Sequence, residues 1–246
     1  MQQEESIKKG QIFFSTTVAE TSLTFRNLVY VLDSGKIRSP YYDPERKITY
    51  LKEFDCAEST LRQRKGRLGR TGFKGTYILM NDTVTNRPKY PYSDLEKIDL
   101  TDIYFDLLRS TSGNISEVNK ILEAVPTAEP EKFKLKIKEA NKSLVALGIL
   151  SSETSVSDEG VSCFFLPIRG TAKMYKSVLA GLENKCGRDM IIIAVAMVVL
   201  EQSLQQVLKA AGARISKKDG DFMTLIKLFR EILKKEVETG RLDEAL

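Results

Sequence analysis

The sequence predicts an α/β domain followed by a mainly helical half, on three observations. Between residues 11 and 80, short apolar runs alternate with a turn-containing aromatic segment, a helix and a glycine-rich loop, which is typical of an α/β fold. A stretch rich in Pro and Asn at residues 81–94 then indicates a linker. Beyond it, apolar residues recur at helical spacing over most of the remaining chain.

The first half contains two apolar runs that predict buried strands, QIFFS at 11–15 and LVYVLDSG at 28–35. A third strand is expected at 75–80, where GTYILM follows a series of glycines. Between them, YYDPERKITYL at 41–51 places aromatic and β-branched residues around a Pro-containing turn, which predicts a hairpin. The segment at 56–72 predicts a helix with an N-cap at Ser59, running to about Lys65 and ended by its glycines.

The second half predicts three helices, a pair of short strands and a further group of helices. Three helices followed by a two-stranded wing is the winged-helix order, and the rest indicates a helical bundle. We therefore expect three domains, at residues 1–90, 91–166 and 167–246. The helices are expected at 100–110, 114–125, 129–148, 171–184, 187–211 and 219–239, and the wing between the third and fourth of them.

Composition excludes several kinds of catalytic site. The chain has no histidine, which rules out Ser-His-Asp and Cys-His nucleophile systems and histidine metal sites. Its three cysteines, Cys56, Cys163 and Cys186, are too widely spaced for a zinc motif, so we expect buried thiols, a reducing compartment and no metal ligands. The net charge of +5 favours a polyanionic partner.

The termini and apolar runs carry no sign of membrane insertion. The N-terminal residues MQQEESIKKG are polar, unlike a signal peptide. The longest apolar run, MIIIAVAMVVL at 190–200, is too short to span a bilayer. We expect a soluble intracellular protein with no membrane partner.

One short segment concentrates positive charge and glycine. QRKGRLGR at 63–70 has four cationic side chains and two glycines. Arg67 and Arg70 flank Gly69, so both guanidinium groups could close on one phosphate while the backbone approaches it, and Gln63 could orient a water molecule for hydrolysis. The alternative is a basic loop that contacts RNA or solvent.

A second segment, STTVAETSLTF at 15–25, is rich in hydroxyl groups directly after a predicted strand. Hydroxyls and free backbone amides at a strand end suit contacts to phosphate and ribose. The alternative is an ordinary capped loop.

Together, these segments resemble motifs of the superfamily 2 helicases of the DEAH/DExH type, including their poxvirus-like branch. STTVAETSLT at 15–24 is similar to motif V and QRKGRLGR at 63–70 to motif VI, with a hairpin between them. The resemblance continues more weakly to SVSDEGVSCFFLPIRGTAKMYKSVLAG at 155–181 and DGDFMTLIKLFREI at 219–232. It implies the C-terminal part of the second RecA-like domain, then a winged helix, then a helical-bundle (ratchet) domain truncated before any OB-type domain.

The resemblance also implies roles for individual residues. Gln63 would position the attacking water and Arg67 and Arg70 would contact the γ-phosphate, while Thr16 would contact an RNA phosphate. Thr17, which stands where cellular members usually have Asn, is a further candidate for RNA contact. Ser22, Thr24 and Gly66 are the candidates for nucleotide contact.

The predicted hairpin is a candidate RNA wedge. Tyr41, Tyr42 and Tyr50 offer ring faces for base stacking, and Arg46 and Lys47 near the tip can meet phosphates. The alternative is an edge hairpin whose tyrosines pack on the sheet.

Two nucleotide-binding elements have no counterpart in the sequence. It contains neither a GxxxxGK[ST] loop nor an Asp-Glu pair at a strand end. We therefore expect a C-terminal fragment of an ATP-dependent RNA helicase that is inactive alone. Its ATP and Mg²⁺ would be bound mainly by an upstream RecA-like domain 1 of the same protein. The resemblance implies 3′-to-5′ unwinding, RNA as a partner and room for a protein activator. The alternative is a non-catalytic winged-helix module that binds nucleic acid and keeps relic helicase motifs.

Overall fold

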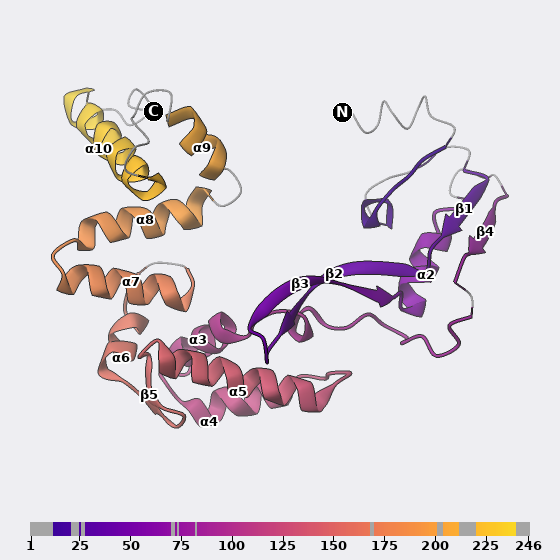
Figure 1. Ribbon diagram of the computed structural model, residues 1–246, viewed down its shortest axis with the longest axis horizontal. Coiled ribbons are helices and arrows are strands. Elements are labelled where there is room, and N and C mark those ends of the chain that lie inside the picture. Colours follow the sequence, from indigo (N-terminus) through magenta and orange to yellow (C-terminus); the bar gives the residue numbers. More distant parts are fainter. Residues whose placement is uncertain are drawn as a thin grey trace. The chain divides into compact units, whose positions relative to one another are not determined.

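The computed structural model describes residues 12–20, 25, 28–69, 72, 74–81, 83–167, 170–200, 204–211 and 220–239. The chain divides into two compact units (Figure 1). The first holds the described residues up to Asp99 together with Pro126–Phe133, and the second holds Leu100–Val125 and the described residues from Lys134 onward. The second unit thus includes most of the expected winged helix and all described residues of the expected bundle, and the boundaries at 90/91 and 166/167 stay predictions.

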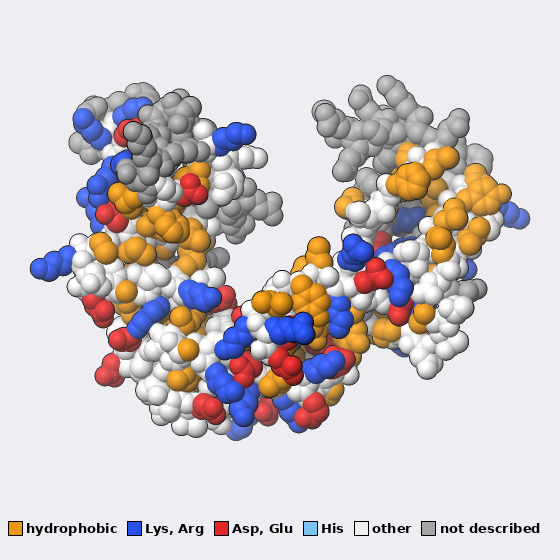
Figure 2. Space-filling model, in the orientation of Figure 1, with side chains coloured by type: hydrophobic (Ala, Val, Ile, Leu, Met, Phe, Trp, Pro, Cys, Tyr) orange, Lys and Arg blue, Asp and Glu red, His pale blue; other side chains and the backbone are white. Residues whose placement is uncertain are grey.

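A parallel pair of strands forms the sheet of the first unit. Strand β1 (Tyr30–Asp33) pairs in parallel with β4 (Thr76–Leu79), so the predicted strands at 28–35 and 75–80 are confirmed. A parallel pair requires a long crossover connection, and here a hairpin and a helix lie between the two strands in sequence. Figure 2 shows hydrophobic side chains gathered over β1 and β4. The exposed hydrophobic residues of these strands include Leu32 and Ile78.

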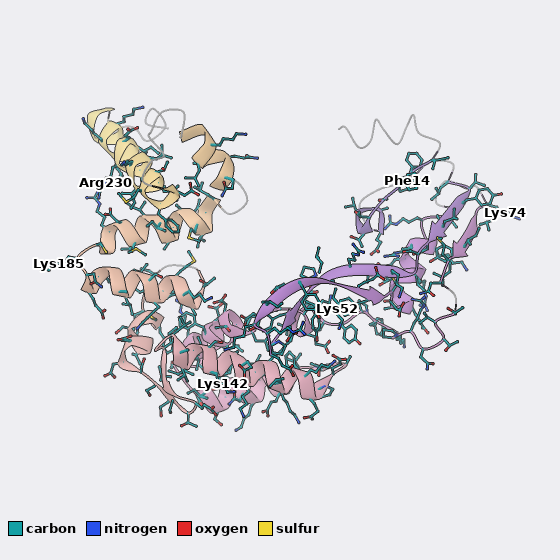
Figure 3. All side chains as sticks on the ribbon, in the orientation of Figure 1. Phe14, Lys52, Lys74, Lys142, Lys185 and Arg230 are labelled. Atoms are coloured by element: carbon teal, nitrogen blue, oxygen red, sulfur yellow. The ribbon has the colours of Figure 1, made fainter. Side chains whose placement is uncertain are left out.

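The strand predicted at 11–15 is wrong for the part that the structure describes. Residues 12–16 are not in a strand, and the ring of Phe14, labelled in Figure 3, is 99% exposed. An isolated extended segment gains stability only by pairing with a neighbour, and among the described residues β1 pairs with β4 alone. The apolar run therefore has the residue types of a strand, but no described strand pairs with it.

The hairpin is confirmed and is longer than predicted. Strands β2 (Lys36–Asp43) and β3 (Ile48–Asp55) pair antiparallel from Lys36 opposite Asp55 to Asp43 opposite Ile48. In the turn, Asp43 Oδ1 accepts hydrogen bonds from the backbone N–H groups of Glu45 and Arg46, at 3.0 and 3.1 Å. The carboxylate of Asp43 thus holds the tip in shape, as expected of Asp before a turn.

The helix α2 (Glu58–Lys65) follows the hairpin, but its predicted N-cap at Ser59 is wrong. The N-cap residue is Ala57, whose side chain cannot accept a hydrogen bond. The N–H groups of Glu58 and Ser59 instead donate to the carbonyls of Pro88 and Lys89, at 2.9 and 3.1 Å. Carbonyl groups of the linker therefore accept the hydrogen bonds that a capping side chain would otherwise accept at the start of the helix.

The linker is fixed to the first unit by an arginine. Arg87 donates from one nitrogen to the carbonyls of Gly35 and Cys56, both at 3.0 Å, and from another to the carbonyl of Asn81 at 2.6 Å. Gly35 has φ of 68°, which glycine adopts without strain. Arg87 thereby joins the β1–β2 turn to the start of α2.

The second unit begins with the predicted helices α3 (Thr101–Ser110) and α4 (Ile115–Glu123), and most of α5 (Pro130–Ala146) belongs to it. A short antiparallel pair, β5 (Leu150–Ser152) with β6 (Ser155–Val156), follows them. This is the element order expected of a winged helix, and that domain assignment stays a prediction.

One helix escaped prediction. The segment after β6 carried loop and strand signals, yet residues Asp158–Phe164 form helix α6. The hydroxyl of Ser157 accepts a hydrogen bond from the N–H of Gly160 at 2.9 Å, which is an N-cap contact. The Ser-Asp-Glu sequence at its start was the signal that could have found it.

The remaining described residues form four helices, which agree with the predicted helical group. The predicted helix at 187–211 is described as two helices, and residues 201–203 between them lie outside the described part. Ala196, Leu208 and Leu225 share a buried cluster, so three of the helices pack on one core. No helix within the described ranges is long and apolar enough to cross a bilayer. The helices are α7 (Ala172–Glu183), α8 (Gly187–Leu200), α9 (Leu204–Ala211) and α10 (Asp221–Thr239).

The cysteines differ in accessibility, which gives a first testable prediction. Cys56 and Cys163 are buried as predicted, but Cys186 is exposed. Burial raises the pKa of Cys56, and it raises the pKa of Cys163 to about 11, so both thiols stay protonated near neutral pH. At about pH 8 we expect iodoacetamide to label Cys186 alone in the folded protein and all three cysteines after denaturation, as measured by mass spectrometry. A Cys186→Ser variant is the control and should stay unlabelled when folded, whereas rapid labelling of Cys163 would contradict its burial.

Candidate functional site

The two motif-like segments lie against each other in the first unit. Residues of the hydroxyl-rich segment form the short 3₁₀-helix η1 (Thr17–Glu20), which contacts α2. Helix α2 carries the beginning of QRKGRLGR, and a turn at residues 66–69 carries its middle. The structure therefore brings together two segments that lie far apart in the sequence, at 15–25 and 63–70.

Arg64 makes the contact between them. Its Nε and one terminal nitrogen lie 2.8 Å from Glu20 Oε1, and its other terminal nitrogen lies 2.6 Å from Asp33 Oδ1. Both terminal nitrogens are also 3.3 Å from the carbonyl oxygen of Lys36. The side chains of Arg64, Glu20 and Asp33 are only 15%, 14% and 2% exposed. An ion pair shielded from water to this degree is stronger and more specific in geometry than one on the surface.

The carboxylate of Asp33 is the most buried member of this group. Besides Arg64, it accepts hydrogen bonds from the N–H of Gly35 at 2.9 Å and from the hydroxyl of Tyr77 on β4. Burial, followed by the hydrogen bond to Asp33, raises the pKa of Tyr77, so its hydroxyl stays a donor. Burial acts to lower the pKa of Arg64, but its hydrogen bonds to Glu20 and Asp33 raise that pKa overall, which keeps the guanidinium charged.

The predicted catalytic residues begin at the next positions along the chain. Gln63 is exposed near the end of α2, and Arg67 is half-buried in the turn that follows. Gly66 is the C-cap, and the N–H of Arg67 donates to the carbonyl of Arg64 at 3.1 Å. Gly69 has φ of 73°, a backbone conformation that favours glycine. The predicted Arg70, Ser22 and Thr24 lie outside the described residues.

A hollow of about 540 Å³ lies beside this turn. Two lysines on its lining, Lys65 and Lys74, supply positive charge, and Lys74 is labelled in Figure 3. Lysines, glycine backbone and the neighbouring Arg67 together suit an anion such as a nucleotide phosphate. The remaining lining residues are Leu68, Gly69, Gly72, Gly75 and Tyr77.

The candidate RNA contacts lie at two places in the first unit. Thr16 and Thr17 are exposed at the start of η1, where their hydroxyls can reach a phosphate. Arg46 and Lys47 are exposed at the tip of the hairpin. Tyr42 differs from expectation, because its side chain is 6% exposed and its ring face is not open to a base.

The aromatic residues on the hairpin form a cluster instead. Tyr41 packs edge-on against Tyr50, with ring centroids 6.1 Å apart, and against Phe54 at 5.8 Å. The ammonium group of Lys52, labelled in Figure 3, lies 4.4 Å from the centre of the Tyr41 ring. Tyr50 is 40% exposed, so it offers a ring surface that a base could stack on.

The described residues contain no group of acidic or cysteine side chains that could hold a metal ion.

Sequence reasoning proposed Gln63 and Arg67 as site residues but missed the ionic group beside them. Arg64 was visible only as one of four cations, and its partners Glu20 and Asp33 lie 44 and 31 residues away in sequence. The available signal was that Glu20 is the one acid in the hydroxyl-rich segment and that Asp33 stands at the end of a predicted strand.

The whole chain can be compared with known proteins. No family model matches it. It is 29% identical over 221 residues to the probable ATP-dependent RNA helicase DHX34 of Mus musculus, covering 87% of this chain and 18% of that protein. It is 28% identical over 237 residues to the ATP-dependent RNA helicase DEAH12, chloroplastic, of Arabidopsis thaliana, covering 91% and 13%. An ATP-dependent RNA helicase HrpA homolog of Haemophilus influenzae is 25% identical over 246 residues, covering 94% and 18%.

Solved structures agree on the fold. The crystal structure of the E. coli DExH-box NTPase HrpB matches with a TM-score of 0.57 at 20% identity, covering 74% of this chain and 21% of that one. A second structure of E. coli HrpB matches with a TM-score of 0.53 at 19% identity, covering 75% and 22%. The chain is thus of mixed α/β fold similar to HrpB, and it spans less than a quarter of the length of these proteins.

Proposed function

The homologues of this chain are DEAH/DExH-box ATP-dependent RNA helicases, and on that premise we propose that it forms part of such an enzyme. In this proposal the first unit supplies one side of an ATPase site and part of an RNA-binding surface. The observation that carries the proposal is the contact between η1 and α2 through Arg64, because it joins the candidate RNA segment to the segment with Gln63 and Arg67. The chain's likeness to helicases over most of its length supports it.

Among the described residues, Arg67 and the two lysines beside it suit the phosphates of ATP. Gln63 would orient the attacking water, and Arg67 with Arg70 would stabilise the charge that develops on the transferred phosphoryl group. Both arginines stay charged at any physiological pH. ATP with Mg²⁺ would be bound mainly by an upstream RecA-like domain of the same protein, where a phosphate-binding loop and acidic metal ligands are expected.

The proposed RNA-binding surface would contact the sugar-phosphate backbone of RNA more than its bases. Thr16 and Thr17 are exposed hydroxyl donors at η1, and cationic side chains at the hairpin tip can meet phosphates. RNA, as a single strand or a duplex with an overhang, would then be the partner, with room for a protein activator. The family resemblance implies 3′-to-5′ movement, which duplexes carrying a 3′ or a 5′ overhang distinguish.

A direct test compares the chain with the full-length protein that carries it. We expect the purified 246-residue chain to hydrolyse no ATP above the buffer blank, with or without RNA, because its sequence has no phosphate-binding loop. The full-length protein should show RNA-stimulated hydrolysis in the same assay of phosphate release. RNA-stimulated turnover by the chain alone would contradict the division of the site, and its absence from the full-length protein would contradict the helicase proposal.

One observation favours the alternative of a nucleic-acid-binding module. Helices α3, α4 and α5 followed by the β5–β6 pair have the element order of a winged helix. If the full-length protein lacks hydrolysis but binds RNA, and the binding survives Arg67→Ala, the module with relic motifs is the better description.

A further inference from the structure

Four segments of the first unit meet at the Arg64 guanidinium. The group sits on α2 and contacts Glu20 of η1, Asp33 at the end of β1 and the carbonyl of Lys36 at the start of the hairpin. One side chain therefore connects η1, the end of β1 and the base of the hairpin to α2. A guanidinium is a planar fork whose nitrogens have fixed relative directions, so a movement of any of these segments changes the hydrogen bonds of the others.

The position of Arg64 in the helix connects this contact to the chemistry. Arg64 directly follows Gln63, and its carbonyl accepts the N–H of Arg67 at 3.1 Å. A shift of Arg64 toward or away from η1 would therefore act on both candidate catalytic groups, Gln63 beside it on α2 and Arg67 in the turn that follows. Misplacement of such groups by a fraction of an ångström to one ångström is enough to slow a reaction that depends on positioning.

Glu20 and Asp33, the two acidic residues that contact Arg64, differ in burial and in their other contacts. Asp33 is almost fully buried and also holds Gly35 and Tyr77, so it fixes α2 to the sheet. Glu20 is at the end of η1, three residues after the exposed Thr17. Since two carboxylates face one guanidinium, neutralising Glu20 leaves Arg64 and Asp33 as a balanced pair and leaves no unpaired buried charge.

We propose that Arg64 is a positioning residue that couples RNA bound at η1 to the placement of Gln63 and Arg67, through its hydrogen bonds to Glu20. The proposal rests on the function proposed above. Arg64 itself contacts neither ATP nor RNA. On this proposal, RNA binding at η1 would strengthen the Glu20–Arg64 contact, and that contact would hold Gln63 and Arg67 in position.

The test uses the full-length protein with Glu20→Gln, and Glu58→Gln as the matched control. Glu58 is an exposed acid in the first turn of α2, so the same substitution removes the same charge nearby. We expect Glu20→Gln to lower the RNA-stimulated turnover number about 10-fold, within the range typical of coupling between two sites. The basal turnover and the RNA concentration that gives half-maximal stimulation should stay within about 2-fold, because neither ATP nor RNA loses a contact. Glu58→Gln should behave as the wild type.

Binding measurements provide a readout that does not depend on turnover. Coupling is reciprocal, so a non-hydrolysable ATP analogue should change the affinity for oligouridine in the wild type, and this change should be lost in Glu20→Gln. Arg64→Lys keeps the charge but cannot make a forked contact to two carboxylates, so it should lose the stimulation as Glu20→Gln does. In an Arg64→Gln background, Glu20→Gln should have no further effect.

The outcomes separate the two proposals. Wild-type stimulation retained in Glu20→Gln, or fully restored in Arg64→Lys, would overturn the coupling role while leaving the helicase proposal intact. An equal loss of basal and stimulated turnover in Glu20→Gln, with a lowered thermal unfolding midpoint, would show a structural role only and would also overturn it. A wild-type protein without RNA-stimulated hydrolysis would overturn both.

Discussion

Arg67→Ala in the full-length protein is expected to lower RNA-stimulated ATP turnover by roughly 10³-fold, within the range found for arginine fingers. The structure supplies the physical reason. Arg67 is half-buried in a turn that begins at the end of α2, beside a hollow of about 540 Å³ with two lysines on its lining. A guanidinium that is held in place before the reaction stabilises developing phosphoryl charge without reorganising, which is the usual origin of large electrostatic effects in catalysis.

The control for this variant is Arg62→Ala. Arg62 is exposed on the same helix, so its loss removes one positive charge from the same element without touching the turn. Phosphate release under saturating RNA and ATP measures the effect, and RNA affinity without nucleotide should change little in either variant. Arg70→Ala is expected to match Arg67→Ala. If both variants hydrolyse ATP normally and bind RNA weakly, QRKGRLGR is a basic RNA loop and the catalytic interpretation is wrong.

The fold was predictable wherever a local pattern sufficed. The helix N-capped by Asn114 and the hairpin turn after Asp43 follow from side chains that bond to backbone within three residues. Prediction failed where the partner is distant in sequence. The start of α2 depends on carbonyls of the linker about 30 residues later, and no local signal at Ser59 could reveal that. The apolar run at 12–16 failed for a related reason, since strand formation depends on a neighbour.

The same distinction separates the residues of the candidate site. Gln63 and Arg67 could be named because their motif is contiguous in the sequence. The Glu20–Arg64 and Asp33–Arg64 pairs could not, because folding alone brings η1 and the end of β1 to α2. Tyr42 illustrates the opposite case, in which a residue type suited to stacking is buried. Alternation along a strand decides this, and Tyr41 and Tyr42 necessarily point to opposite faces.

Shortening the hairpin tip is expected to separate RNA unwinding from ATP hydrolysis. A channel that grips one strand by its phosphates needs a wedge to keep the second strand from following. Replacing Pro44–Lys47 with Asn-Gly keeps Asp43 opposite Ile48 and closes the strands with a two-residue turn of the type that suits their twist. The contact of Arg64 with the carbonyl of Lys36 lies at the other end of the hairpin, so the ATPase site should be unaffected.

The two effects should differ in size. Turnover of ATP with RNA should stay within about 2-fold of the wild type, because the shortened tip is remote from the residues assigned to phosphoryl transfer. Unwinding per ATP hydrolysed should fall about 10-fold, since a wedge that stops one base-pair step from reclosing is worth about 1.4 kcal/mol. Strand separation of a fluorescent duplex and phosphate release, measured on the same preparation, give the ratio directly.

A variant of unchanged loop length shows which property of the tip matters. Arg46→Ser with Lys47→Asn removes the two exposed positive charges of the turn and keeps its four residues, and Asn tolerates the φ of 54° found at Lys47. If the wedge acts by its size, with Tyr50 as the stacking surface, this variant should unwind nearly as well as the wild type. A loss of unwinding in both variants would instead assign the effect to phosphate contacts at the tip. Unchanged unwinding per ATP in the shortened variant would mean that the hairpin is structural, and that strand separation is carried out by another part of the protein.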